Sequence, residues 1–299
     1  MSATATDGAE IARRAEIARL EEIARRIRVA VIRTVDHAKG GHLGGPLSAA
    51  DLLAALYFRV LRIRPAEPAW PERDRFVFSK GHSSIGLYAA MALRGYFPLD
   101  ELFTFDAPDS RLQGHPDMTR TPGLDMSTGS LGMGLSAALG MALGARLLGR
   151  DLRTYAMLGD GECQEGQVWE AAFVASRYGL DRLIAVVDHN RLQQYGWQGA
   201  APEERLPPHG PGELAAKWKA FGWRTLELDG HDMAAILGAF DAAAQGEGRP
   251  TVLIADTVKG RGVSFMEGKF YWHTRILKPE EFAQAMAELG EPLEAMAAQ

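Results

Sequence analysis

The chain has 299 residues, of which 46% are hydrophobic, and a formal net charge of −5 at pH 7. It is long enough for one large domain or one and a half, and its mild charge, without a basic run, argues against nucleic-acid binding. No apolar run reaches the length of a membrane-spanning helix, and we find no signal peptide. Cys163 is the only cysteine and cannot form an internal disulfide, so we expect a reducing, cytoplasmic setting.

The first part of the chain is predicted to be largely helical. A polar tail, residues 1–10, carries too few apolar side chains to order itself. Apolar residues then recur at helical spacing over residues 11–39, opposite an arginine-rich face. Start signals predict a second helix over residues 48–57, and a third covers residues 83–94, where Gly95 ends it.

The rest of the chain alternates strands and helices. Outside the central unit described next, strands are predicted over residues 76–78, 223–228 and 250–255, and helices over residues 135–148 and 233–245. Prolines without periodicity predict a long ordered loop over residues 106–126, of a kind that is often functional. A second proline-rich loop, residues 200–212, is expected to be mobile. Residues 278–299 are predicted to form a C-terminal interface or capping helix, too short for a domain.

The central unit is a strand, a helix and a strand. Residues 154–158 and 183–187 are apolar runs typical of buried strands, and residues 164–179 between them have helical spacing. Such a unit is right-handed and brings the carboxyl ends of both strands to one edge of a parallel sheet, where open α/β sheets bind ligands. Asp160 follows the first strand and Asn190 follows the second, so we expect them to converge.

The residue types at this edge suit a hard metal ion. The carboxylate of Asp160, the amide oxygen of Asn190 and the backbone carbonyl of Leu192 would leave positions of Mg²⁺ or Ca²⁺ for two phosphate oxygens and a water. Gly159 and Gly161 let the backbone turn and approach a ligand closely. The tripeptide Gly-Asp-Gly alone is often only a turn, but its strand and helix context favours a metal and diphosphate site.

Several motifs together resemble the thiamine-diphosphate motif of transketolases. These are Gly-Asp-Gly running to Asn190 and four further blocks, Gly40–Pro46, Ser79–His82, Gln113–Pro116 and Ser127–Gly134. They occur in family order from about residue 20 to 275. The resemblance implies an α/β fold, a parallel sheet with helices on both faces, in which residues 11–277 form the diphosphate-binding domain. A full-length transketolase is about twice this size.

The resemblance also assigns site residues. His42 would face the reacting sugar, His82 the cofactor diphosphate and His115 the donor hydroxyls, while His273 matches a further family histidine. Residues matching the cofactor-binding positions are His82, Gly129, Ser130, Leu131, Gly159, Asp160, Gly161, Glu162 and Asn190. Glu165 matches an acid at the subunit interface. The basic segment 257–267 resembles the mobile loop that closes such sites, although a surface loop is an equally good interpretation.

The implied activity is transfer of a two-carbon ketol unit from a ketose, or ketose phosphate, to an aldose by means of thiamine diphosphate. In this family a glutamate that activates the cofactor lies in a second, pyrimidine-binding domain, and we recognise no counterpart of that domain in the sequence. We therefore expect a separate C-terminal transketolase subunit to supply it, with active sites between chains, in a heterotetramer of two copies of each.

Some features leave the substrate and the family branch open. Residues 274–277 replace the family's usual Gly-Ala-Pro after His273, and Tyr195 stands where the family commonly has Asp. Both border the substrate channel, so pentose phosphates and branched or sulfonated sugars all remain candidates. The alternatives are half of a deoxyxylulose-phosphate synthase-like or ketoacid dehydrogenase-like enzyme, or a noncatalytic scaffold. His209 and His231 are predicted to be surface residues, and Cys163 a small, unreactive side chain.

Overall fold

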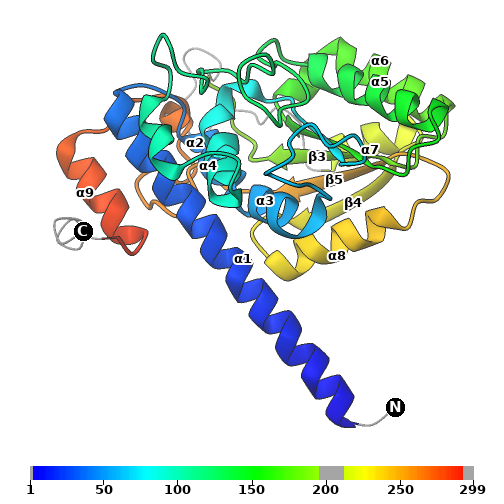
Figure 1. Cartoon of the computed structure of the whole chain (residues 1–299), viewed down its shortest axis with the longest axis horizontal. Helices are drawn as coiled ribbons and strands as arrows, with labels where there is room; N and C mark the ends of the chain where they lie inside the picture. Colours follow the sequence, from blue (N-terminus) through cyan, green and yellow to red (C-terminus); the bar gives the residue numbers. More distant parts are fainter. Residues whose placement is uncertain (1–2, 195–211, 292–299) are drawn as a thin grey trace.

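A parallel sheet forms the centre of the molecule (Figure 1). The computed structural model describes residues 3–194 and 212–291. Within these ranges the sheet has five strands in the order β1-β2-β3-β5-β4, and every neighbouring pair is parallel. They are β1 Arg75–Phe78, β2 Thr154–Gly159, β3 Leu183–His189, β4 Arg224–Asp229 and β5 Thr251–Asp256. The predicted strands and the α/β fold class are confirmed.

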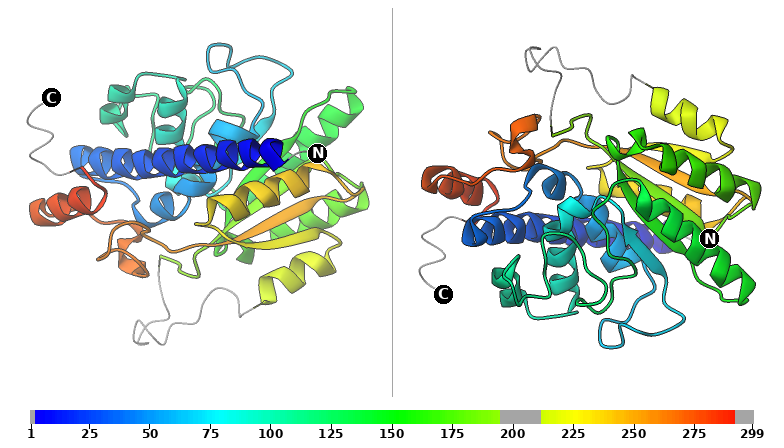
Figure 2. Two further views of the ribbon diagram at one scale, coloured as in Figure 1. Left: turned by 90° about the horizontal axis from the view of Figure 1, so that it is seen from below. Right: turned by 90° about the horizontal axis from the view of Figure 1, so that it is seen from above.

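Helices cover both faces of this sheet (Figure 2). They are α1 Ala3–Ala38, α2 Gly44–Ser48, α3 Ala50–Ala55, α4 Ser84–Arg94, α5 Met133–Leu147, α6 Gly166–Arg177, α7 Glu213–Ala220, α8 Met233–Ala244 and α9 Pro279–Glu288. Tyr155 and Met157 of β2 point into a core shared with α1, α3, α4 and α8. Ala156 and Leu158 point into a second core shared with α5, α6 and α7. This alternation is what a parallel sheet buried on both faces requires.

The strand register decides where a ligand site can form. Gly159, the last residue of β2, is paired with Asp188 near the end of β3, so the segments that follow both strands leave the sheet side by side. β1 pairs with β2 on one flank and β5 pairs with β3 on the other. Residues that follow β1 and β5, including Lys80 and Lys259, therefore emerge at the same edge as Asp160 and Asn190.

The N-terminal helix is longer than its periodicity predicts. α1 begins at Ala3, so the expected tail is helical apart from the first two residues, which lie outside the described range. The side chains of residues 10–15 are exposed, so local stability there comes from alanines, which have high helix propensity, and from an ion pair between Arg14 and Glu10 at i,i+4. The start of α1 extends away from the sheet in Figure 1. No helix in the described part of the chain is long and apolar enough to cross a membrane.

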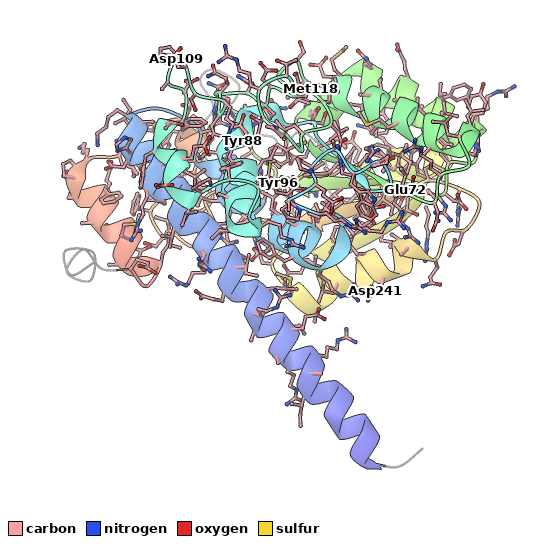
Figure 3. The ribbon with its side chains drawn as sticks, viewed as in Figure 1. Glu72, Tyr88, Tyr96, Asp109, Met118 and Asp241 are labelled. Atoms are coloured by element: carbon pink, nitrogen blue, oxygen red, sulfur yellow. The ribbon has the colours of Figure 1, made fainter. Side chains whose placement is uncertain are left out.

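One predicted helix differs from the structure in detail, and one predicted loop agrees with it. The helix expected over residues 48–57 divides into α2, α3 and a π-helical turn over Leu56–Val60. The loop over residues 106–126 is ordered, as predicted, because buried side chains fasten it to the fold. Tyr88 of α4, labelled in Figure 3, donates from its hydroxyl to the carbonyl of Gln113 at 3.0 Å.

The C-terminal part of the chain lies against α1. α9 begins at Pro279, as its start signal predicts, and Arg25 of α1 donates to the carbonyl of Leu289 at 2.6 Å. α7 was not predicted: it is short, and fully buried Trp218, packed 4.8 Å from the ring of Trp223, is what attaches it to the core. Most of the predicted loop over residues 200–212, and residues 292–299, lie outside the described residues.

Candidate active site

A cavity of about 430 Å³ opens at the carboxyl edge of the sheet. The predicted site residues that line it are His42, His82, His115, Gly129, Leu131, Gly159, Asp160, Gly161, Glu162, Asn190, Leu192 and His273. Ser130 is exposed and does not line it. Segments from widely separated parts of the chain thus meet where the strand order places them, although the individual roles of these residues stay predictions.

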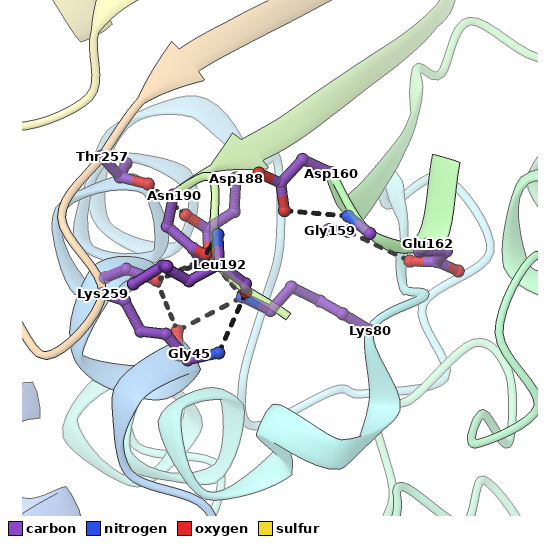
Figure 4. Close-up of polar contacts among 12 residues, drawn as sticks. Gly45, Lys80, Gly159, Asp160, Glu162, Asp188, Asn190, Leu192, Thr257 and Lys259 are labelled. Carbon is purple, nitrogen blue, oxygen red and sulfur yellow. Dashed lines mark hydrogen bonds and ion pairs between the residues drawn. The ribbon is translucent and has the colours of Figure 1, made fainter. Parts of the chain in front are cut away.

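The three predicted metal ligands face this cavity (Figure 4). Backbone N–H groups fix the Asp160 carboxylate: Gly161 donates to Oδ1 at 2.8 Å and Arg191 donates to Oδ2 at 2.6 Å. Asn190 donates from Nδ2 to Ser48 Oγ at 3.3 Å, which identifies Oδ1 as its acceptor atom. A side chain at Gly159 would meet no protein atom within 4 Å, so the cavity is open above the Gly-Asp-Gly turn that follows β2.

The electrostatics around Asp160 fit a bound cation. Burial, together with the negative charge of Asp188, raises the pKa of Asp160 to about 7. A divalent ion would remove this penalty, because it stabilises the ionised carboxylate directly. Among the described residues no cluster of three or more His, Cys, Asp or Glu side chains could hold a metal alone. One carboxylate, one amide and one carbonyl would be a weak ligand set, which phosphate oxygens would have to complete.

A buried ion pair supports the floor of the cavity. The ammonium of Lys80, which is 2% exposed, contacts the fully buried carboxylate of Asp188. Asp188 also accepts hydrogen bonds from Ser48 at 2.6 Å and from Thr257. The charge of Lys80 and these hydrogen bonds outweigh the opposing effect of burial and hold the pKa of Asp188 below its ordinary value. Lys80 is thus both a structural partner of Asp188 and a positive charge at the cavity wall.

Lys259 is a second ammonium in the cavity. Its Nζ lies 3.1 Å from the carbonyl oxygen of Leu192 and 2.8 Å from Nδ1 of His273. Burial, with the nearby charge of Lys80, lowers its pKa to about 8. Segment 257–267 therefore does not lie wholly on the surface: Lys259 is 2% exposed, whereas Arg261 is exposed and pairs with Glu267 at 3.5 Å.

Three histidines form a compact group above these charges. The ring centroids of His42, His82 and His273 lie 5.0–5.1 Å apart, and the rings of His82 and His273 are stacked. Burial and neighbouring positive charges lower the pKa to about 4 for His42 and to about 2 for His82 and His273. The three rings are therefore neutral near pH 7, each with one donor and one acceptor nitrogen. His115 lies at the exposed side of the cavity.

The carboxylate oxygens of Glu162 are bonded to the protein itself. Its Oε1 accepts from Gly132 N–H at 2.9 Å and from the hydroxyl of Ser79, and its Oε2 accepts from Gly159 N–H at 3.1 Å. The carboxylate, 2% exposed, thus ties together three segments that line the cavity. Burial raises its pKa, although these hydrogen bonds oppose the shift. The sequence indicated that Glu162 belongs to the site but not that its oxygens face the protein.

Two further predictions can be compared with the structure. Cys163 is buried, and desolvation with the nearby charge of Glu162 raises the pKa of its thiol, as expected for an unreactive side chain. His231 is not a surface residue: its side chain is 9% exposed and contacts Asp51. The prediction was wrong because the partners of His231 come from distant parts of the chain. His209 and Tyr195 lie outside the described residues.

Comparison with known proteins agrees with this geometry. A family model described as "Transketolase, thiamine diphosphate binding domain" matches residues 20–297. The chain belongs to the transketolase family. A 6-deoxy-6-sulfo-D-fructose transketolase subunit from Clostridium sp. (strain MSTE9) is 45% identical over 263 residues, which cover 88% of this chain and 93% of that relative. A subunit of apulose-4-phosphate transketolase from Phocaeicola vulgatus is 39% identical, covering 89% of this chain and 92% of that relative.

Solved transketolases share the fold. The transketolase from Leishmania mexicana superposes with a TM-score of 0.84 at 30% identity, covering 91% of this chain and 41% of that one. The transketolase from Campylobacter jejuni gives 0.82 at 31% identity, covering 91% and 43%. This chain thus spans less than half the length of these transketolases but nearly all of the relatives named as subunits. It is an N-terminal, diphosphate-binding subunit of the split transketolase type, and the deoxyxylulose-phosphate synthase, ketoacid dehydrogenase and scaffold alternatives are not favoured.

Proposed function

We propose that this chain binds thiamine diphosphate through Mg²⁺ and, with a second subunit, transfers a two-carbon ketol unit between sugars. The observation that carries the proposal is the meeting of Asp160, Asn190 and Leu192 with two ammonium groups and four histidines in one cavity. Metal ligands and ammonium groups suit a diphosphate, whereas imidazoles suit hydroxyl and carbonyl oxygens. Ca²⁺ would suit the same ligands.

Different residues of this chain would bind the metal and the diphosphate. Asp160, Asn190 and the Leu192 carbonyl would hold the metal, and the ammonium groups of Lys80 and Lys259 would balance the diphosphate charge. Bound thiamine diphosphate supplies the carbanion chemistry that a protein lacks, by accepting the two-carbon unit from the ketose.

The histidine group would handle protons on the sugar. Because His42, His82 and His273 are neutral near pH 7, each can donate one hydrogen bond; His42 and His82 can also accept one, whereas Nδ1 of His273 already faces the Lys259 ammonium. A neutral imidazole can also take up a proton from a hydroxyl group when the carbon–carbon bond of the ketose breaks. His115, on the exposed side, is placed to contact the more distant hydroxyls.

We further propose that the pyrimidine-binding domain comes from a partner chain, in a heterotetramer. In support, the relatives of nearly equal length are named as transketolase subunits, whereas solved transketolases in which this chain covers 41–43% are much longer. A reducing, cytoplasmic setting is also proposed, and the free, buried thiol of Cys163 is compatible with it.

For the substrate we propose a ketose with a terminal anionic group. The names of the relatives above specify 6-deoxy-6-sulfo-D-fructose and apulose 4-phosphate, both of which are anionic. Metal ligands, ammonium groups and histidines line the cavity and would be engaged by the cofactor and the reacting end of the sugar. The anionic group at the other end of the sugar would therefore lie toward the mouth of the cavity or the partner chain.

Cofactor binding and product analysis test these proposals. The chain, alone and with its copurifying partner, would be titrated calorimetrically with thiamine diphosphate and Mg²⁺, with Asp160→Ala as the matched control. Sulfofructose, apulose phosphate, a ketopentose phosphate and pyruvate would then be offered as donors. We expect binding that Asp160→Ala abolishes, and aldose products from a ketose only when both chains are present. Full activity without a partner, or turnover of pyruvate alone, would overturn the assignment.

A further inference from the structure

A buried polar network lies behind the segment that carries Lys259. Arg28 of α1 contacts the carboxylate of Asp51 in α3, and the Oδ2 atom of Asp51 lies 2.7 Å from Nδ1 of His231. Arg28 and Asp51 are 8% and 6% exposed, and the side chain of His231 is 9% exposed. On its other side, His231 Nε2 accepts from the backbone N–H of Val258 at 2.8 Å. One imidazole thus connects the helical layer with the residue next to Lys259.

The two contacts of His231 define its tautomer, that is, which ring nitrogen carries the hydrogen. An N–H group donates to Nε2, so Nε2 carries no hydrogen, and the ring hydrogen must lie on Nδ1, where it donates to Asp51. The arrangement needs an ionised Asp51 as acceptor. Burial acts against that charge, but the hydrogen bond from His231 and the charge of Arg28 outweigh it and lower the pKa of Asp51. Each nitrogen of His231 therefore has one definite partner.

The Val258 contact is one of several that fix this segment. Thr257 N–H donates to the carbonyl of His189 at 3.2 Å, and Gly260 N–H donates to the carbonyl of Gly44 at 3.0 Å. A side chain at Gly44 would approach Lys259 Cγ to 2.7 Å, so the Lys259 side chain has little free space. Between these two backbone contacts, the imidazole of His231 holds the N–H of Val258.

We infer that His231 is a positioning residue, which fixes Val258 and thereby holds the Lys259 ammonium at the diphosphate end of the cavity. His231 does not line that cavity, so it acts through the backbone rather than by touching a ligand. The inference rests on the proposed function in one respect, namely that Lys259 faces the diphosphate of a bound cofactor. The His231–Val258 connection itself does not depend on the cofactor.

Two substitutions separate the two nitrogens of His231. In His231→Asn the amide reaches only as far as Nδ1, so it can still donate to Asp51 but leaves Val258 N–H without an acceptor. In His231→Gln the amide reaches as far as Nε2, so its oxygen can accept from Val258 while the donor to Asp51 is lost. If His231 acts through Val258, the Gln variant should behave like the unchanged protein and the Asn variant should not.

Hydrogen exchange of the whole chain, without cofactor, gives the first readout. We expect peptides covering residues 257–262 to exchange faster in His231→Asn but to keep their protection in His231→Gln. His37→Asn is the matched control, because His37 is exposed and its ring contacts Phe103 at a centroid distance of 5.0 Å, outside the site. Equal exchange in all variants, or faster exchange in Gln than in Asn, overturns the inference. If the Asn variant does not fold, lost protection in the Gln variant alone overturns it.

Cofactor affinity, measured calorimetrically with thiamine diphosphate and Mg²⁺ on the complex with the partner chain, gives the second readout. We expect about tenfold weaker binding in His231→Asn, because one hydrogen bond that positions Lys259 is lost. In a Lys259→Met background His231→Asn should cause no further loss. An undiminished loss there would overturn the inference. Failure of the unchanged complex to bind the cofactor would instead overturn the proposed function, while the exchange experiment would still judge His231.

Discussion

Glu162 offers the sharpest test of how the cavity is held together. Its two oxygens accept from Gly132 N–H at 2.9 Å, from Gly159 N–H at 3.1 Å and from the hydroxyl of Ser79. In Glu162→Gln one oxygen becomes an NH₂ group, which faces a backbone or hydroxyl donor instead of accepting from it. An unsatisfied buried donor costs about 1–3 kcal/mol, so we expect the free energy of unfolding to fall by about 2 kcal/mol.

The penalty for Glu162→Ala should be larger. Alanine leaves all three donors without the carboxylate, so we expect a loss of about 3 kcal/mol or more. Because burial raises the pKa of Glu162, part of this loss is offset by removal of a costly buried charge. The sign follows from linkage: an acid with a raised folded-state pKa destabilises the fold as pH rises from its unfolded-state pKa past the folded-state one. The offset is therefore greatest at alkaline pH, and the loss should be smaller there.

Urea unfolding of the chain, followed by tryptophan fluorescence, measures these losses. Glu170→Gln is the matched control, because Glu170 lies on the exposed side of α6 and should change the free energy of unfolding by less than about 0.5 kcal/mol. If Glu162→Gln is as stable as this control, the carboxylate does not bind the three segments together. A loss in Gln that equals the loss in Ala would show that the amide forms none of the original hydrogen bonds.

Three further predictions concern the same edge of the sheet. The pKa of His42 is lowered to about 4, so the fold is destabilised as pH falls below 6.5, where the unfolded chain takes up a proton that the folded chain does not. We expect the free energy of unfolding to decrease by about 2 kcal/mol between pH 8 and pH 5 from this group. Urea unfolding of His42→Gln across that range should show a correspondingly flatter dependence on pH. Lys80→Met leaves the buried carboxylate of Asp188 without its partner and should cost about 3–5 kcal/mol in the same assay. Gly134→Ala places a methyl group 2.9 Å from a backbone carbon of the segment after β1 and should lower the thermal midpoint, whereas Gly140→Ala on the same helix, with no atom within 4 Å, should raise it.

The sequence predicted the sheet well because its signals are local. β2 and β3 are continuous apolar runs, and both are buried along their lengths, as parallel strands covered on two faces must be. The rule that places ligands at the carboxyl edge then brought Asp160 and Asn190 together without any knowledge of side-chain contacts. The residues that directly follow the strands were accessible in this way, whereas His42, His115, Gly129 and His273 were assigned from the family resemblance.

What could not be predicted depends on distant partners. Glu162 follows Gly-Asp-Gly, and only the positions of Ser79 and Gly132 decide that its oxygens face the protein. His231 lies in a short polar stretch that is typical of a turn, and its burial depends on Arg28 and Asp51 from two remote helices. Local periodicity carries no information about such contacts, so polar residues that hold a site in place are harder to recognise than those that face it.

The charges in the cavity explain why metal and diphosphate should bind together. Lys80 is already balanced by Asp188, whereas burial shifts the pKa of Asp160 up to about 7 and that of Lys259 down to about 8. A cation alone would relieve Asp160 but add to the positive charge around Lys259, and a diphosphate alone would do the reverse. Together they remove both penalties, since each supplies the charge that one of these side chains requires. Binding should therefore be cooperative, and the carbonyl of Leu192, which Lys259 contacts at 3.1 Å, connects the two.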